Sequence, residues 1–201
     1  MRDLRIVFMG TPDFAVAILK RLVEDNYTIV GVVTAPDKPA GRGRKITESA
    51  VKKYALEHDL NVLQPKNLKA PEFIKELKDL NADLQVVVAF RMLPEVVWDM
   101  PEMGTFNLHA SLLPQYRGAA PINWAIINGE NKTGVTAFFI NEVIDTGDII
   151  EQRTVDIQEG MNAGELHDQL MVVGAELIYD TLENLNDDKI EKQHQKVEST
   201  T

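Results

Sequence analysis

The sequence predicts one α/β domain built on an open, mostly parallel sheet with helices on both faces and an antiparallel edge. Apolar, β-branched runs alternate with segments of helical spacing over the first hundred residues, which is the pattern of successive βαβ units. The run from Asp83 to Phe90 is nearly continuous in apolar residues, as expected for a strand buried on both faces. Two later runs, 134–140 and 148–155, flank a turn and predict an antiparallel pair.

The N-terminal half supplies most of the expected parallel sheet. Leu4–Met9 and Thr28–Thr34 are predicted strands, and the apolar residues of Asp13–Glu24 have helical spacing. With 201 residues, the chain is long enough for one such domain and a short extension. The remaining elements expected in this half are helices at 48–57 and 71–80 and a short strand at 62–63.

Residues 35–45 contain prolines and glycines, so we expect an exposed, irregular loop there. Positive charge gathers in this loop, although the formal net charge of the protein is −10. Basic side chains beside flexible glycines suit contact with a phosphate backbone, and a solvated charge run is the alternative. The overall acidity confines any nucleic-acid contact to a local patch. The candidate residues are Lys38, Arg42, Arg44 and Lys45.

The stretch from Gly104 to Trp124 carries the strongest chemical pattern. Asn107 and His109 alternate with apolar residues, so both polar side chains are expected on one face at the end of a strand. Asp145 lies on the turn between the two later strands, where its carboxylate is able to orient an imidazole and hold its charged form. A structural histidine is the alternative interpretation.

The C-terminal third is predicted to be mainly helical and then polar. Helices are expected from Pro121 to Asn128 and from Met161 to Leu185. Residues 187–201 are polar and charged, so they are expected to form a tail or linker after a domain spanning 1–186.

The absence of cysteine excludes a disulfide framework and a thiolate nucleophile. Without a signal peptide or an apolar run of ~20 residues, we expect a cytoplasmic protein with no membrane contact.

Together, several short motifs resemble the methionyl-tRNA formyltransferase family, whose fold is Rossmann-like. The resemblance covers Leu4 to about Leu185. Family members are similar to one another in having a further C-terminal β-barrel domain, so residues 187–201 would lead toward a domain absent here. Phe90-Arg-Met-Leu-Pro94 departs from the family pattern and looks more like glycinamide ribonucleotide formyltransferase. The motifs are Gly10-Thr-Pro-Asp-Phe-Ala15, Pro39-Ala-Gly-Arg-Gly43, Asn107-x-His109, Ser111-Leu-Leu-Pro114, Arg117-Gly-Ala-Ala-Pro121 and Asp145-Thr-Gly-Asp148.

The resemblance implies transfer of a formyl group from 10-formyltetrahydrofolate to the methionine α-amine of methionyl-initiator tRNA. It further implies direct acyl transfer through an oxyanion, with no metal and no obligate protein partner. Asn107 and His109 would donate hydrogen bonds to the oxyanion, and Asp145 would help to move the proton of the amine. Folate would be contacted by Phe90, Arg91, Met92, Leu93, Ser111, Leu112, Leu113, Pro114, Ile140 and Val143.

Other functions remain open at this point. A sugar-nucleotide N-formyltransferase would keep the same three catalytic side chains but has no reason to carry the basic loop. A formyltetrahydrofolate hydrolase would use water in place of the amine, and Asn107 argues against it. A non-catalytic tRNA-binding module is disfavoured by the complete Asn, His and Asp set and by the acidic charge balance.

Overall fold

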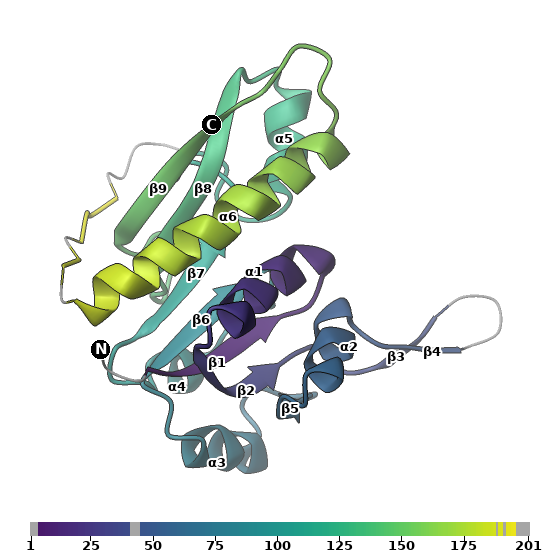
Figure 1. The fold of residues 1–201 in the computed structure, drawn as a ribbon, viewed down its shortest axis with the longest axis vertical. Helices are drawn as coiled ribbons and strands as arrows, with labels where there is room; N and C mark the ends of the chain where they lie inside the picture. The colour runs from purple at the N-terminus through teal and green to yellow at the C-terminus, as the bar shows by residue number, and fades with distance from the viewer. Residues whose placement is uncertain (1–3, 41–44, 188, 191, 196–201) are drawn as a thin grey trace. The chain divides into compact units, whose positions relative to one another are not determined.

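The computed structural model describes residues 4–40, 45–187, 189–190 and 192–195. The described residues form two compact units, an N-terminal unit up to Thr105 and a C-terminal unit from Phe106 onward (Figure 1). The parallel strands lie in the N-terminal unit and the antiparallel strands in the C-terminal unit. The predicted α/β class with an antiparallel portion is therefore confirmed.

The N-terminal unit has a parallel sheet in the order β5-β2-β1-β6. Every residue of β6 is buried, which confirms the prediction of a strand covered on both faces. Helix α1 has the predicted bounds and carries Asp13 in its first turn, near the positive end of the helix dipole. The elements are β1 (Arg5–Gly10), α1 (Asp13–Glu24), β2 (Thr28–Val33), α2 (Ala50–Glu57), β5 (Val62–Leu63), α3 (Pro71–Asp79), β6 (Leu84–Val88) and α4 (Glu95–Trp98).

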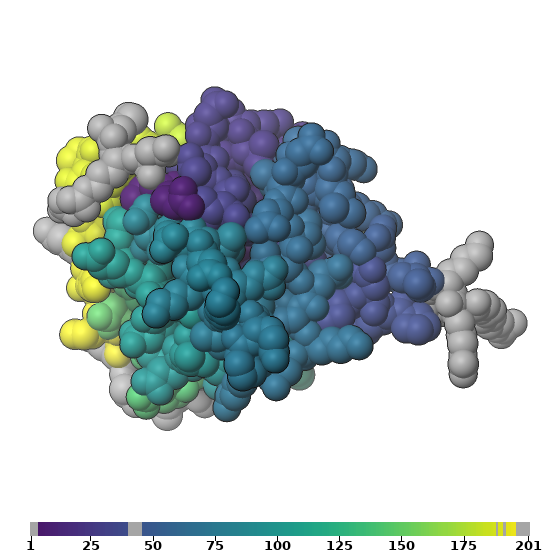
Figure 2. Space-filling view, turned by 90° about the horizontal axis from the view of Figure 1, so that it is seen from below, coloured from purple at the N-terminus to yellow at the C-terminus, as the bar shows by residue number. Residues whose placement is uncertain are grey.

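A small hairpin replaces part of the predicted irregular loop. Strands β3 (Lys38–Ala40) and β4 (Lys45–Thr47) pair in antiparallel fashion and protrude from their unit (Figures 1 and 2). The prediction of irregular structure was wrong here because both strands of a two-stranded hairpin are edge strands, where a proline such as Pro39 is tolerated. Of the basic candidates, Arg42 and Arg44 lie outside the described residues.

The C-terminal unit contains three strands that pair in antiparallel fashion, in the order β7-β8-β9. The predicted pairing of the two later strands is confirmed. Helix α6 packs against β8 and β9 and buries Leu166, Leu170 and Leu177 (Figure 1). The elements are β7 (Thr105–His109), α5 (Pro121–Ile127), β8 (Lys132–Phe139), β9 (Ile149–Asp156) and α6 (Ala163–Asn186).

Capping residues explain where two helices begin. Ser49 accepts a hydrogen bond from the Lys52 amide at 3.0 Å, so α2 begins at Ala50 rather than at the predicted residue 48. Asn162 and Glu165 form a capping box, so α6 begins two residues later than predicted.

No helix in the described part of the chain combines the length and the apolar character needed to cross a bilayer.

Candidate active site

Asn107 and His109 lie at the end of β7, as the alternation of the sequence predicts. Phe106 and Leu108 point into the core and are buried, so the two polar side chains share the other face. Across the sheet, His109 pairs with Thr136 of β8. The strand thus holds an amide and an imidazole side by side on a rigid element.

Both nitrogens of the His109 ring face polar groups of the protein. Nε2 donates to the main-chain carbonyl of Tyr116 at 2.8 Å. Because a carbonyl oxygen only accepts, Nε2 carries a proton whether the ring is neutral or charged. Nδ1 lies 3.6 Å from Oδ2 of Asp145, which is an ion-pair distance when the ring is protonated and longer than a hydrogen bond. The predicted meeting of His109 and Asp145 is therefore present.

Asp145 is held from several sides within the loop 141–148, here called the Asp145 loop. Its Oδ2 accepts a hydrogen bond from the Gly118 amide at 2.7 Å, and its carbonyl accepts one from Arg117 Nε at 3.0 Å. Its backbone has a φ of 53°, a left-handed conformation that aspartate tolerates better than most residues. Gly147 passes so close to β8 that an added Cβ would lie 1.6 Å from the Phe139 carbonyl oxygen. The carboxylate is thus fixed mainly by main-chain groups.

Asn107 offers an amide that the protein leaves partly unsatisfied. Its Oδ1 is buried, and among the described residues it has no hydrogen-bond partner. A buried polar atom without a partner costs about 1–3 kcal/mol, so such an atom is a candidate for ligand contact. Oδ1 only accepts hydrogen bonds, so the group able to donate to a developing negative charge is Nδ2 of the same amide, which lies beside His109 on β7.

Hydrogen bonds fix the segment 111–114, which follows β7. The Ser111 hydroxyl donates to the Gln115 carbonyl at 2.6 Å, and Thr136 Oγ1 contacts both the Ser111 carbonyl at 2.7 Å and the Leu113 amide at 3.1 Å. The Ser111 hydroxyl gives its proton to a main-chain carbonyl and not to a basic side chain, which is not the arrangement of an activated nucleophile. Ser111 and Leu113 are buried, whereas Leu112 and Pro114 keep exposed surface, so these last two are the residues of the segment accessible to a ligand.

The other predicted folate contacts are accessible to different degrees. In the Asp145 loop, Val143 is 61% exposed, and Ile140, just before the loop, is half-buried. In the N-terminal unit, Phe90 is half-buried and lies 5.6 Å from the guanidinium carbon of Arg91. The predicted folate contacts of each unit thus include accessible apolar side chains.

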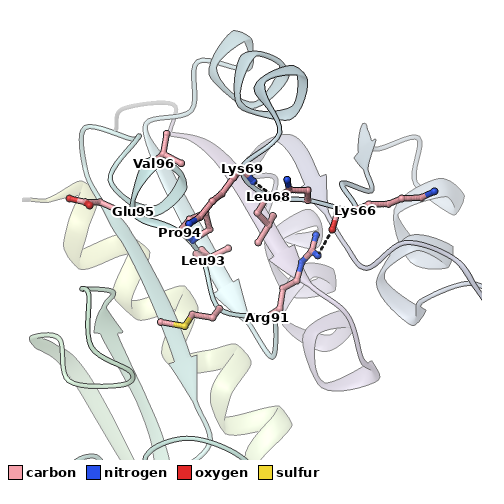
Figure 3. Close-up of a pocket in the computed structure, with 10 residues that line it drawn as sticks. Lys66, Leu68, Lys69, Arg91, Leu93, Pro94, Glu95 and Val96 are labelled. Carbon is pink, nitrogen blue, oxygen red and sulfur yellow. Dashed lines mark hydrogen bonds between the residues drawn. The ribbon is translucent and has the colours of Figure 1, made fainter.

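An open groove of about 830 Å³ lies beyond the end of β6 in the N-terminal unit (Figure 3). Arg91 directs its guanidinium to the Lys66 carbonyl at 3.0 Å and also donates to the Pro65 carbonyl. Partial burial lowers the pKa of Arg91, whose guanidinium nevertheless stays charged. The groove is lined by Lys66, Asn67, Leu68, Lys69, Arg91, Met92, Leu93, Pro94, Glu95 and Val96.

The base of the β3–β4 hairpin is tied to α2 by charged side chains. Lys52 Nζ lies 2.6 Å from Asp37 and 2.7 Å from Glu48. The hydrogen bond from Lys52 lowers the pKa of the Asp37 carboxyl, and a second from Gln64 adds to this effect. Lys38, the first residue of the hairpin, is exposed, and for Lys45 the structure describes the backbone in β4.

Several contacts of the site have no local sequence signal. The Tyr116 carbonyl and the Gly118 amide act through the main chain, and Gln195 reaches the Asp145 loop from the polar segment after α6.

Within the described ranges, no three histidine or acidic side chains gather in a geometry suited to a metal ion.

Comparison with known proteins decides the family. The family model described as formyl transferase matches residues 4–182. The chain belongs to the formyl transferase family. A methionyl-tRNA formyltransferase of Flavobacterium johnsoniae is 65% identical over 182 residues, which cover 90% of this chain and 58% of that protein. This formyl transferase chain therefore spans somewhat more than half the length of that relative.

Solved structures share the fold at low sequence identity. Glycinamide ribonucleotide transformylase 1 from Symbiobacterium toebii superimposes with a TM-score of 0.80 at 17% identity, covering 98% of this chain and 96% of that one. A sugar 3N-formyl transferase solved in the presence of dTDP and 5-N-formyl-THF gives a TM-score of 0.73 at 21% identity, covering 100% and 70%. The Rossmann-like fold expected for this formyl transferase is thus confirmed.

Proposed function

We propose that the protein transfers a formyl group from 10-formyltetrahydrofolate to the α-amine of methionyl-initiator tRNA. The observation that carries this proposal is the convergence of Asn107, His109 and Asp145 in a chain 65% identical to a methionyl-tRNA formyltransferase. The donor is supported by the family and by a structural relative, the sugar 3N-formyl transferase, that was solved in the presence of a formyl folate. The proposal concerns the whole protein, including any part beyond this chain.

The reaction is acyl transfer from one nitrogen to another. The amine nitrogen bonds to the formyl carbon, an oxyanion forms, and the bond from that carbon to N10 of the folate breaks. The Asn107 amide and protonated His109, through Nδ1, stabilise the oxyanion by about 3 kcal/mol per donor. Asp145, with Oδ2 3.6 Å from Nδ1, faces the imidazole and helps to transfer the proton lost by the amine toward N10.

We further propose which residues of each unit contact folate and which contact tRNA. In the C-terminal unit, Leu112, Pro114 and Val143 present the accessible apolar surface expected for folate. In the N-terminal unit, Phe90 to Leu93 remain the predicted folate contacts. The basic hairpin remains the predicted contact with tRNA phosphates, which implies an affinity that falls with rising salt.

A transfer assay with 10-formyltetrahydrofolate tests the proposal directly. Methionyl-initiator tRNA and an amino sugar nucleotide are offered as acceptors, and formylated product is measured for each. We expect kcat/KM for the tRNA to exceed that for the sugar nucleotide by at least about 100-fold. A preference for the sugar nucleotide would establish the alternative function, and tRNA binding without transfer to either acceptor would indicate a non-catalytic module.

A further inference from the structure

The polar segment after α6 returns to the Asp145 loop. We call residues 192–195 the C-terminal strap. The Gln193 amide donates to the Ile149 carbonyl at 2.9 Å, and the Ile149 amide donates to the Gln193 carbonyl at 2.8 Å. His194 contacts the Asp148 carboxylate through Nδ1. The strap is therefore fixed in register beside the last residues of the loop.

Gln195 makes the most contacts of any strap side chain within the described residues. Its Nε2 donates to the carbonyls of Asp145 at 3.0 Å and of Gly147 at 2.8 Å. Its Oε1 accepts from Arg117 Nη2 at 2.6 Å. Two acceptors on one side and a cation on the other determine the orientation of the amide, so both halves of the side chain are used.

These bonds close a ring that includes both the carbonyl and the carboxylate of Asp145. Gln195 joins the Asp145 carbonyl to Arg117, and the next residue, Gly118, donates its amide to Asp145 Oδ2 at 2.7 Å. Arg117 also donates directly to the Asp145 carbonyl. Asp145 has a φ of 53°, and these bonds on its carbonyl and carboxylate favour that left-handed conformation.

We infer that Gln195 is a positioning residue that keeps the Asp145 carboxylate beside His109. This inference rests on the proposed function for its kinetic consequence, while its structural basis is the ring of bonds. Displacing a catalytic group by about 1 Å costs on the order of 100-fold in rate, so a side chain outside the reacting groups is able to control turnover through Asp145. The strap thereby makes a segment distant in sequence part of the active site.

The test compares Gln195→Met and Gln195→Glu with Gln193→Ala in the full chain. Met removes the donor and the acceptor at similar size, and Glu keeps an acceptor for Arg117 but loses the donor to the two carbonyls. Gln193 contacts β9 through its main chain, so Gln193→Ala keeps the strap register and is the matched control. We expect both Gln195 variants to lower kcat between about 10- and 100-fold, with KM for folate within about twofold of the wild-type value.

Hydrogen exchange of the Gly118 amide supplies a readout that needs no acceptor. This amide donates to Asp145 Oδ2, so its exchange should accelerate by about tenfold or more in both Gln195 variants and stay unchanged in Gln193→Ala. Gln195 variants with wild-type kcat and wild-type exchange would overturn the inference. If wild-type protein formylates no amine but Gly118 exchange responds as expected, the proposed function fails and the positioning role stands.

Discussion

The Asp145 loop and the β3–β4 hairpin both carry predicted functional residues, yet they are held differently. In the loop, Asp145 accepts hydrogen bonds through both its carboxylate and its carbonyl. Gly147 packs closely against the Phe139 carbonyl. The hairpin protrudes and is tied at its base, where Lys52 meets Asp37. Ile46 on its second strand is 72% exposed.

This difference matches the work proposed for each segment. Acyl transfer needs a carboxylate placed within a few tenths of an ångström, which main-chain bonds and burial provide. Attraction of a polyanion depends on charge at longer range and tolerates a segment anchored at its base. Experiments that alter one anchor at a time test whether the two segments really differ in this way.

Asp145→Asn is expected to have the largest effect. Asn tolerates the left-handed backbone, and its amide oxygen is still able to accept from Gly118, so the fold should persist. The negative charge facing His109 is lost, and we expect kcat to fall by at least about 100-fold. Glu142→Gln removes the same charge from an exposed residue of the same loop and should keep near-normal kcat. Comparable kcat values for the two variants would refute the role given to Asp145.

Thr136→Val tests the support beneath the site and should act on stability. Its buried hydroxyl donates to the Ser111 carbonyl and accepts from the Leu113 amide and from Gln152. Val has the same shape but leaves these partners unpaired, at a cost of about 1–3 kcal/mol. We expect the melting temperature to fall by roughly 2–10 °C. Thr154→Val, at an exposed position on β9, is the control and should shift it by less than about 2 °C.

Lys52→Met tests the base of the hairpin and should have the smallest effect. Lys52 lowers the pKa of Asp37, so the ion pair stabilises the fold above the ordinary carboxyl value of 3.8, and this contribution is lost as the pH falls through the lowered value. Urea midpoints of the variant and of wild type should therefore differ at neutral pH and converge in acid.

The same variant has a kinetic consequence under the proposed function. KM for methionyl-tRNA should rise about three- to tenfold, while kcat stays within about twofold of wild type. Lys53→Met removes the same charge from the next, exposed residue of α2 and should leave the urea midpoint unchanged. An equal rise in KM for methionyl-tRNA in Lys53→Met would show that the rise comes from the lost positive charge and not from loss of the contact between Lys52 and Asp37.

Periodicity in the sequence predicted the elements that position the site. The alternation through Asn107 and His109 placed both side chains on one face of β7, because a strand has a strict period of two. The continuous apolar run of β6 likewise predicted a strand buried on both faces. The approach of Asp145 to His109 was expected from a shared motif and from the turn, and the structure has these side chains in contact.

The features that the sequence did not predict depend on long-range or main-chain contacts. The Tyr116 carbonyl that fixes the protonated nitrogen of His109 is available in every residue type, so no sequence pattern marks it. Gln195 lies in a polar segment whose composition is typical of a linker, and its contacts with Arg117 form only when the chain returns to the loop. Hairpin strands β3 and β4 were missed because prolines and glycines favour irregular structure.

Gly147 has a practical consequence for anyone who diversifies this chain by directed evolution. Even a methyl group at this position would collide with the Phe139 carbonyl oxygen, 1.6 Å away, so a library randomised at residue 147 would consist largely of inactive clones. Ile144, three residues earlier, is 56% exposed, so a different side chain there would meet few neighbouring atoms. Variation in this loop should therefore be directed to residue 144, with Gly147 kept invariant.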